Sequence, residues 1–338
     1  MERQDFISLL SPEGQALLAQ VGPLEAKADV VKLVSSLRAQ GHDAGLVAAV
    51  LTQAKLRRRA GAKFGPFAER MIFTEAGLEQ ASRLSVAALH ANRFRQAGIK
   101  TVADLGCGIG AESMAMASLD INVKAFEIDE VTAAVATYNL ALFENALVEQ
   151  ADVTQLDLSK FGGLFFDPAR RELGGPARER ASRKFDPAAF SPTFDFVIEA
   201  AAKKPTGVKF GPGHPHEGIP DHAEAQWVSV DGDLVELGLW FGEVARPNVK
   251  RAALLIAGGT RHEILSDSVE RKDAPIAELG DYVYEPDNAI VRSHLIGQLA
   301  EEIDATLFAP EIAYLTSDKK IESPWLKGYQ VLDNLVFD

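Results

Sequence analysis

The segment Asp104-Leu-Gly-Cys-Gly-Ile-Gly110 constrains the fold of this chain more than any other feature of the sequence. It ends a largely apolar run that starts at Ile99, and it places three glycines at alternate positions. Since glycine has no Cβ atom, the backbone there can turn tightly and approach a ligand closely. The residues from Glu112 to Leu119 then have the pattern of a helix. We therefore expect a strand, a ligand-binding loop and a helix, in this order.

The composition is that of a large globular protein. With 338 residues, of which 47% are hydrophobic, the chain can bury a large core, and its length suggests two or three domains. Its one cysteine, Cys107, excludes a disulfide framework and a cysteine-rich metal site. The formal net charge of −13 disfavours indiscriminate attraction to nucleic acid or to anionic membranes. No apolar stretch is long enough to cross a bilayer and no basic leader begins the sequence, so we expect a cytoplasmic protein without a membrane partner.

Three regions with different patterns predict three domains. Apolar residues recur at helical spacing from Ser11 to Arg95, which predicts a helical N-terminal domain over residues 1–95. Residues 96–258 alternate short apolar strands with helices, as in a doubly wound α/β sheet, and Asp231-Gly232 predicts an antiparallel edge hairpin. Residues 259–338 have the mixed pattern of a small α+β domain. The expected strands are Thr101–Leu105, Val123–Ile128, Leu164–Phe166, Gly207–Phe210, Ala225–Val230, Leu234–Trp240, Ala252–Ala257 and Tyr329–Phe337, and a helix is expected over Ala289–Ile303.

Acidic residues near the expected strand ends point to a nucleoside ligand. Asp104 stands two residues before Gly106, where its carboxylate attracts an ammonium group and repels a pyrophosphate. This favours S-adenosylmethionine over NAD, although Gly106-x-Gly108-x-x-Ala111 also satisfies the relaxed dinucleotide-binding pattern. Glu127 follows Gly106 by 21 residues, at the end of the second strand, and suits the two ribose hydroxyls.

Two further acids complete this set. Asp129 is a second candidate for the ribose, and Asp152 stands where a third strand should end, next to the position of an adenine amino group. The alternative for each of these acids is that it caps a helix or ends a strand in solvent. The order of the whole set is more specific than any one member.

These segments, DLGCGIG, FEID, ADV and FFDPAR, resemble in order and spacing the class I S-adenosylmethionine-dependent methyltransferases, over about Lys100 to Trp240. The resemblance implies a Rossmann-like core. It also implies that Asp104 and the glycine loop hold the methionine portion of the cofactor, Glu127 the ribose and Asp152 the adenine; the glycines of this loop are Gly106, Gly108 and Gly110.

The whole chain resembles bacterial proteins that join this core to a helical N-terminal segment and a C-terminal THUMP-like domain. The segments that carry this similarity are Gly280–Asp287 and Ala313–Asp318. THUMP domains bind RNA, so the resemblance gives an analogy for the partner of the C-terminal domain.

The segment Asp167-Pro168-Ala169-Arg170 ends the fourth strand and holds the candidate catalytic residues. The Asp167 carboxylate and the Pro168 carbonyl can accept hydrogens from an amino group, which favours nitrogen as the methyl acceptor. The segment resembles the Asp/Asn-Pro-Pro-aromatic motif of exocyclic amino methyltransferases, but Ala169 replaces the second proline and Arg170 the aromatic residue. The alternative is that Asp167 caps a helix that Pro168 begins. C5 methylation of pyrimidines is excluded, because it needs an activated cysteine and Cys107 is expected to be buried in the loop.

Two basic clusters offer contacts to RNA, since arginine binds phosphate bidentately and nearby aromatic residues stack on unpaired bases. The first precedes the α/β region, and the second lies in the predicted mobile loop Arg171–Lys184. The alternative is that these charges only solvate a surface. The candidate RNA contacts are Arg57, Arg58, Arg59 and Lys63 in the first cluster and Arg171 in the second.

The loop His214–His222 concentrates three of the seven histidines. We expect no metal there, because glycine and proline are dense and no cysteine assists. His216 is instead a candidate to orient or deprotonate an acceptor. The expected function is therefore methylation of a nitrogen of an RNA base, in tRNA or rRNA. The alternatives are a small-molecule or protein N-methyltransferase and a non-catalytic RNA-binding factor that retains the fold. NAD-dependent oxidoreduction is a fourth and more distant alternative.

Overall fold

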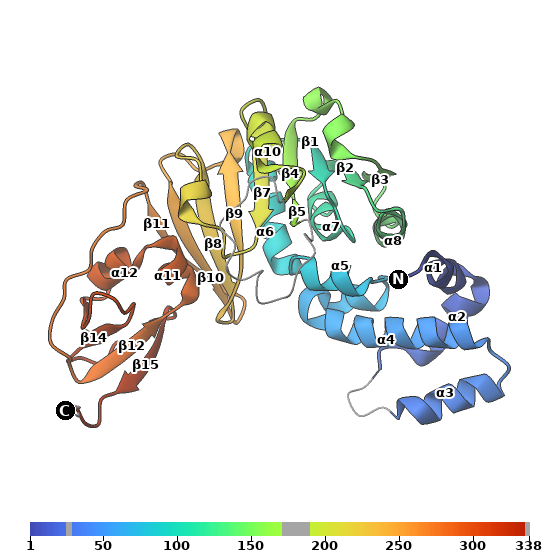
Figure 1. The fold of residues 1–338 in the computed structure, drawn as a ribbon, viewed down its shortest axis with the longest axis horizontal. Helices are drawn as coiled ribbons and strands as arrows, with labels where there is room; N and C mark the ends of the chain where they lie inside the picture. Colours follow the sequence, from blue (N-terminus) through green and yellow to red (C-terminus); the bar gives the residue numbers. More distant parts are fainter. Residues whose placement is uncertain (25–28, 171–189, 335–338) are drawn as a thin grey trace. The chain divides into compact units, whose positions relative to one another are not determined.

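The computed structural model describes residues 1–24, 29–170 and 190–334. The chain divides into two compact units, Met1–Ala169 and Arg170–Asp338, and Figure 1 shows the fold of each. The domain boundaries expected after residues 95 and 258 stay predictions. The predicted mobile loop, with Arg171 and the rest of the second basic cluster, lies outside the described residues.

The first unit begins with the predicted helical region. Its helices are α1 (Arg3–Leu10), α2 (Pro12–Val21), α3 (Val30–Ala39), α4 (Ala44–Phe64), the short 3-10 helix η1 (Gly65–Glu69), α5 (Glu75–Gln80) and α6 (Leu84–Gln96). Apolar side chains of α4 are buried along much of its length, among them Val50, Leu56 and Phe64. This face explains the helical spacing of apolar residues in the sequence.

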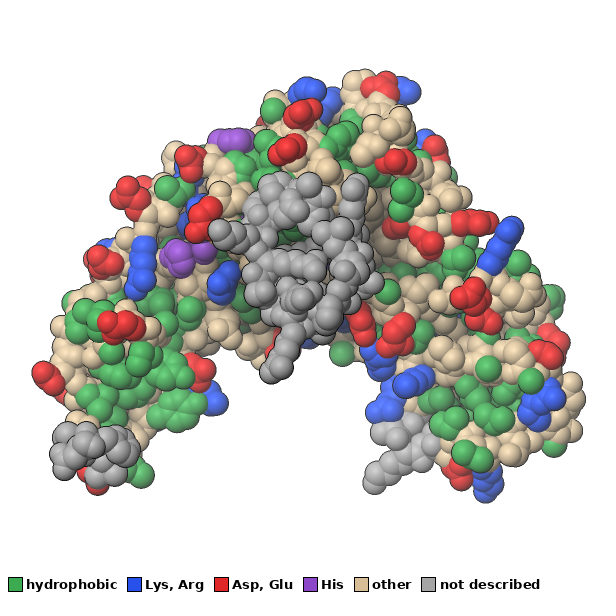
Figure 2. All heavy atoms as spheres, viewed as in Figure 1, with side chains coloured by type: hydrophobic (Ala, Val, Ile, Leu, Met, Phe, Trp, Pro, Cys, Tyr) green, Lys and Arg blue, Asp and Glu red, His purple; other side chains and the backbone are tan. Residues whose placement is uncertain are grey.

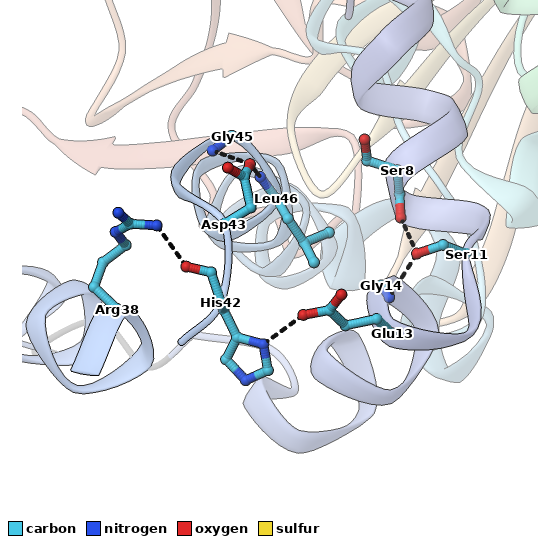
Figure 3. A network of polar contacts seen from close by, with 9 residues as sticks. All are labelled: Ser8, Ser11, Glu13, Gly14, Arg38, His42, Asp43, Gly45 and Leu46. Atoms are coloured by element: carbon cyan, nitrogen blue, oxygen red, sulfur yellow. Dashed lines mark hydrogen bonds and ion pairs between the residues drawn. The ribbon is translucent and has the colours of Figure 1, made fainter. Parts of the chain in front are cut away.

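Polar side chains fix where these helices begin and how they meet (Figure 3). The Ser11 hydroxyl accepts a hydrogen bond of 3.0 Å from the Gly14 N–H at the start of α2. The Asp43 carboxylate accepts hydrogen bonds from the N–H groups of Gly45 and Leu46, in the first turn of α4, at 2.8 and 3.1 Å. His42 Nδ1 lies 2.7 Å from the Glu13 carboxylate, which joins the loop before α4 to α2. Each cap satisfies N–H groups that a helix leaves unpaired.

The second part of the first unit is a parallel sheet. Its strands are β1 (Thr101–Leu105), β2 (Asn122–Glu127), β3 (Ala146–Gln150) and β4 (Gly163–Phe166), in the order β4-β1-β2-β3, and its helices are α7 (Ala111–Ala117) and α8 (Glu130–Leu140). The rings of His90 and Phe94 in α6 pack against Phe165 of β4, at centroid distances of 5.5 and 6.5 Å. Helix α6 therefore covers this sheet, although it precedes the expected boundary.

The second unit continues the α/β pattern. It contains α10 (Phe194–Ala201) and the strands β7 (Thr206–Phe210), β8 (Glu224–Val230), β9 (Asp233–Phe241), β10 (Arg251–Ala257) and β11 (Thr260–Ser266), in the order β7-β9-β8-β10-β11; the short strands β5 (Ala169–Arg170) and β6 (Phe190–Ser191) precede them. Asp231 and Gly232 have positive φ angles of 49° and 89°, which a two-residue hairpin turn requires. The predicted hairpin β8–β9 is therefore confirmed, but its predicted position at the edge of the sheet is wrong, because β7 and β10 flank it. The edge strand is β11, which the sequence reasoning missed.

The C-terminal part forms a small antiparallel sheet with two short helices. The elements are β12 (Tyr282–Pro286), α11 (Asn288–Ser293), α12 (Ile296–Glu302), β13 (Thr306–Leu307), β14 (Leu315–Ser317) and β15 (Leu326–Gln330), with the strand order β13-β14-β12-β15. The single helix expected over Ala289–Ile303 is wrong, because His294 takes a left-handed conformation with φ 62° and ends α11. The last strand also begins and ends earlier than the expected Tyr329–Phe337.

The predicted fold class is confirmed: a helical N-terminal region, a doubly wound α/β core with an antiparallel hairpin, and a small α+β part at the C-terminus. Within the described ranges no helix is long and apolar enough to cross a membrane.

Candidate functional site

The candidate site lies along one edge of the sheet in the first unit. The parallel strands β4, β1, β2 and β3 are neighbours, so their carboxyl ends meet at this edge. Asp167 follows β4, Gly106 follows β1, Glu127 ends β2 and Asp152 follows β3. In open α/β sheets this edge is where ligands bind.

The glycine loop has the backbone that the sequence predicts. Gly106, Gly108 and Gly110 have φ angles of 91°, 53° and 91°, which side chains other than that of glycine rarely adopt. The N–H groups of Gly106 and Cys107 both donate to the Phe126 carbonyl of β2, at 2.9 and 3.0 Å. A Cβ atom on Gly108 would meet nothing within 4 Å, which leaves open space against the backbone. The loop is thus held to β2 and open to a ligand.

Asp104 lies beneath this loop. Its carboxylate is fully buried, and its Oδ2 accepts a hydrogen bond of 2.5 Å from the Ser113 hydroxyl of α7. Its negative charge therefore acts on the loop from within the protein. A direct contact of Asp104 with an ammonium group stays a prediction.

Cys107 is buried, as expected. Burial raises the pKa of its thiol well above the usual value, and the charges of Asp104 and Glu127 raise it further. A thiolate nucleophile is thus disfavoured at this position.

The Glu127 carboxylate is held at the edge by two backbone groups. Its Oε2 accepts from the Gly108 N–H at 3.1 Å, and its Oε1 accepts from the Asp129 N–H at 3.0 Å. These bonds join the end of β2 to the glycine loop and fix the direction of the carboxylate. A carboxylate oxygen has lone pairs for further donors, so hydroxyl groups of a ligand can bind there too.

Asp129 and Asp152 both cap helices. Asp129 accepts from the N–H and the hydroxyl of Thr132 at the start of α8, and these bonds lower the pKa of Asp129. Asp152 accepts from the N–H and the hydroxyl of Thr154 at 2.9 and 2.7 Å. Capping is the alternative to the predicted ligand roles of these two acids. The two roles are compatible, because a capping carboxylate still has oxygen lone pairs for a ligand. Their roles as ribose and adenine ligands stay predictions.

Asp167 packs directly against the glycine loop. A Cβ atom on Gly106 would lie 3.1 Å from the Asp167 carbonyl oxygen, and the Asp167 N–H donates to the Leu105 carbonyl. Asp167 is half-buried and Pro168 is buried. The chain continues into the short strand β5 and not into a helix, so the alternative in which Asp167 caps a helix is wrong. The side chain of Arg170 is outside the described part.

Sequence reasoning missed Asn139. Its side chain, on α8, donates to the carbonyls of Ile72 and Ile109, both at 3.0 Å, and accepts from the Ile72 N–H at 2.8 Å. Ile109 belongs to the glycine loop, and Gln53 of α4 makes a similar pair of bonds with Phe73. The segment between α4 and α5 is thereby tied to the loop. A buried asparagine in the apolar part of a helix was the signal in the sequence.

The first basic cluster mostly contacts its own chain. Arg57 is buried and donates to the Met71 carbonyl at 2.9 Å. Arg59 forms ion pairs with Glu75 and Glu79, and Lys63 donates to three carbonyls at the end of α5, those of Leu78, Glu79 and Ala81. Of the four predicted contacts, Arg58 alone is exposed without a side-chain partner among the described residues. The cluster therefore has a structural role that its spacing did not reveal.

His216 belongs to the second unit. Its ring stacks between Trp227, at 5.0 Å, and His294, at 3.8 Å, and its Nε2–H donates to the Arg292 carbonyl at 2.9 Å. Burial and the charge of His294 lower the pKa of His216 to about 4. The imidazole is thus neutral near pH 7 and a weak base, which disfavours the predicted role in deprotonation. The described residues form no group of three metal-ligand side chains.

The edge as a whole combines a glycine backbone open to close approach with carboxylates that accept hydrogens from hydroxyl and amino groups. These properties suit a nucleoside that carries a positive charge, and the buried charge of Asp104 disfavours a pyrophosphate at the loop.

Comparisons with known proteins agree with this chemistry. Residues 67–162 match the family model of the methyltransferase small domain, and residues 2–60 match a domain of unknown function, DUF8688. The uncharacterized S-adenosylmethionine-dependent methyltransferases of Mycobacterium tuberculosis strains CDC 1551 / Oshkosh and H37Rv are each 30% identical over 295 residues, which covers 84% of this chain and 77% of theirs.

A solved structure has a similar fold. The crystal structure of a protein described as a methyltransferase from Porphyromonas gingivalis W83 matches with a TM-score of 0.63 and 20% identity. The match covers 86% of this chain and 76% of that protein. At this identity the similarity supports the fold alone.

Proposed function

Because this chain belongs to the S-adenosylmethionine-dependent methyltransferases, we propose that it transfers the methyl group to a nitrogen of an RNA base, in tRNA or rRNA. The cofactor is S-adenosylmethionine, which supplies an electrophilic methyl group on a sulfonium. One observation carries the proposal: the backbone of Asp167 packs on Gly106, so the candidate acceptor segment adjoins the cofactor loop.

The residues at the sheet edge fit this cofactor. We assign the open backbone at Gly108 and the buried charge of Asp104 to the methionine portion, since an ammonium group is attracted there. Glu127 holds the ribose hydroxyls, with Asp129 as a second ligand, and Asp152 holds the adenine amino group. The position of Glu127 is already fixed by two N–H groups, so little ordering is needed when a ligand binds.

The acceptor segment orients an amino group. The Asp167 carboxylate and the Pro168 carbonyl accept its hydrogens, which directs the nitrogen lone pair at the methyl group for an in-line displacement. In such a displacement the nitrogen–carbon bond would form as the carbon–sulfur bond breaks, with its electron pair left on sulfur. The Asp167 carboxylate would accept the proton that the nitrogen loses. Arg170 is placed by the sequence to contact the acceptor or its phosphate, in the position of the missing aromatic residue.

RNA as the substrate rests on the basic residues and on the resemblance of the C-terminal part to THUMP-like domains. Of the N-terminal cluster, the proposal retains Arg58, while Arg57, Arg59 and Lys63 have partners in the chain. Arg171 belongs to the second basic cluster. The three-domain division and a cytoplasmic location stay part of the proposal.

The test measures transfer of a labelled methyl group from S-adenosylmethionine to RNA from bacterial cells. We expect label in RNA with the wild-type protein, and kcat about a hundredfold lower with Asp167→Ala. Asp167→Asn retains an acceptor oxygen and should retain more activity than the alanine variant. Asp157→Asn is the matched control, because Asp157 is an exposed cap of a short 3-10 helix. Equal activity of wild type and Asp167→Ala would reject the role of Asp167.

A small-molecule or protein N-methyltransferase is the second candidate. The formal charge of −13 favours it, since the field of the whole molecule repels a polyanion. Label that enters protein or small molecules but not RNA would support this candidate against the first.

A further inference from the structure

The second unit holds a cluster of cations that the cofactor site does not use. We call it the arginine–histidine cluster: Arg251, Arg271, Arg292, His216 and His294. Arg251 begins β10, Arg292 lies in the last turn of α11, and His294 ends that helix. Figure 2 shows a histidine side chain with basic and acidic side chains near it on this part of the surface.

Arg251 is the unusual member of the cluster. It is only 6% exposed, and its Nη1 donates to the carbonyl of the adjacent Lys250 at 3.0 Å, a bond that leaves its other donors for a ligand. It forms no ion pair within the described part of the chain; the charge of Asp221 acts on it from a distance. A buried guanidinium without a carboxylate partner loses hydration without compensation, so an anion is favoured beside it.

The other cations surround the same place. The charges of Arg271, Arg292 and Arg251 all lower the pKa of His294, after the larger effect of burial, so these guanidinium groups are within electrostatic reach of its ring. Arg292 donates to the His214 carbonyl at 3.4 Å and forms no ion pair among the described residues. The charge of Glu217 raises the pKa of His294, and Glu217 forms no ion pair with these three arginines. Among the charges that act most on His294, three are cationic and Glu217 is anionic, in a chain of formal charge −13.

The backbone and the rings hold the cluster in place. In the sheet, Arg251 pairs with Ser266 of β11 and with Ala225 of β8. Trp227 follows Ala225 by two residues along β8. Because side chains alternate between the faces of a sheet, those of Arg251 and Trp227 lie on the same face. His216 stacks on the buried Trp227, His294 stacks on His216 with the rings 9° from parallel, and His216 bonds the Arg292 carbonyl. A neighbouring open pocket, which Arg271 also lines, carries Asp267 and Glu270 and is not the anion site.

We propose that the arginine–histidine cluster binds a phosphate group of the RNA substrate, with Arg251 and Arg292 as its ligands and Arg271 at the rim. The proposal rests on the proposed function for the identity of the ligand. Arginine suits this role because its planar fork bonds two oxygens of one phosphate.

The test compares binding of unfractionated tRNA by wild type, Arg292→Gln, Arg271→Gln and the control Arg261→Gln over a range of salt concentrations. Arg261 is an exposed arginine of β11 outside the cluster. We expect roughly tenfold weaker binding by the cluster variants and no change in the control. The slope of log K against log salt concentration should also be smaller in the cluster variants, by the amount that about one phosphate contact contributes. Arg292→Lys should restore part of the affinity. Binding of S-adenosylmethionine should stay unchanged in all four variants.

Titration of the wild type with inorganic phosphate gives a second readout. An anion beside His294 should raise the pKa of this histidine, which NMR of its ring protons reports. Unchanged tRNA affinity and salt dependence in both glutamine variants would overturn the proposal. If the wild type binds no tRNA while phosphate still shifts the pKa of His294, a tRNA ligand is rejected here and for the proposed function, and a small anion remains at the cluster. If tRNA is methylated normally by both variants at unchanged KM, only the phosphate subsite is rejected.

Discussion

Glu127 illustrates, at the scale of a single residue, how one carboxylate can serve both the loop and a ligand. It accepts from the Gly108 and Asp129 N–H groups and still has lone pairs for hydroxyl groups. We predict that Glu127→Ala weakens binding of S-adenosylmethionine about 10–100-fold, because charge-assisted hydrogen bonds to the ribose are lost. Calorimetric titration measures this, with Glu149→Ala, an exposed acid of β3, as the control. Unchanged affinity would remove Glu127 from the cofactor site.

His216 should make the stability of the protein depend on pH. Burial and the charge of His294 lower its folded-state pKa to about 4, whereas an unfolded histidine titrates near 6.5. Between these values the unfolded chain binds a proton that folded His216 does not, so the free energy of unfolding should fall as the pH drops from 6.5 towards 4. His216→Phe keeps a ring for stacking and should show a weaker pH dependence.

Urea unfolding at pH 7, 6 and 5 measures this difference. Arg251, Arg292 and His294 are the other charged or titratable groups that act on His216, and they are unchanged in the variant. His262→Phe, on β11, is the control and should follow the wild type. The same pH dependence in His216→Phe and wild type would contradict the prediction.

At the scale of elements, Asn139 joins three parts of the first unit. It extends from α8 to the glycine loop and to the segment before α5, with all three hydrogen bonds buried. We predict that Asn139→Ala lowers the free energy of unfolding by roughly 1–3 kcal/mol, because buried backbone groups lose their partners. It should also weaken cofactor binding, since the loop at Ile109 loses a support.

Urea unfolding and cofactor titration of the same variant separate these two effects. Thr137→Ala is the matched control, because Thr137 is an exposed residue of the same helix. A loss of stability without any change in affinity would show that Asn139 supports the fold but not the loop geometry.

At the scale of the whole molecule, the proposed cofactor ligands all lie in Met1–Ala169. A ligand that binds the folded state stabilises it by about 2.7 kcal/mol at a hundred times its Kd. We predict that S-adenosylhomocysteine slows hydrogen exchange in the loop after β1 and at the end of β2, and leaves β12 to β15 unchanged. Hydrogen exchange followed by mass spectrometry tests this, with a sample that contains adenosine alone as the control. Protection confined to the second unit would place the cofactor elsewhere.

The sequence by itself determined the fold class, the strand–loop–helix unit at Gly106 and the hairpin at Asp231-Gly232. These depend on local chemistry, because glycine permits positive φ angles and apolar spacing reports which face of an element is buried. Family membership followed from the same local segments.

Only the tertiary structure decided what the polar side chains contact. The first basic cluster has the composition of an RNA site. In the folded chain, however, the side chains of Arg57, Arg59 and Lys63 bind carbonyl and carboxylate groups that are distant in sequence. Asn139 and the arginine–histidine cluster come together from segments far apart along the chain, and no spacing in the sequence encodes that proximity. A charged or polar residue acts through whichever partners folding brings near it, so its role is a property of the packed molecule.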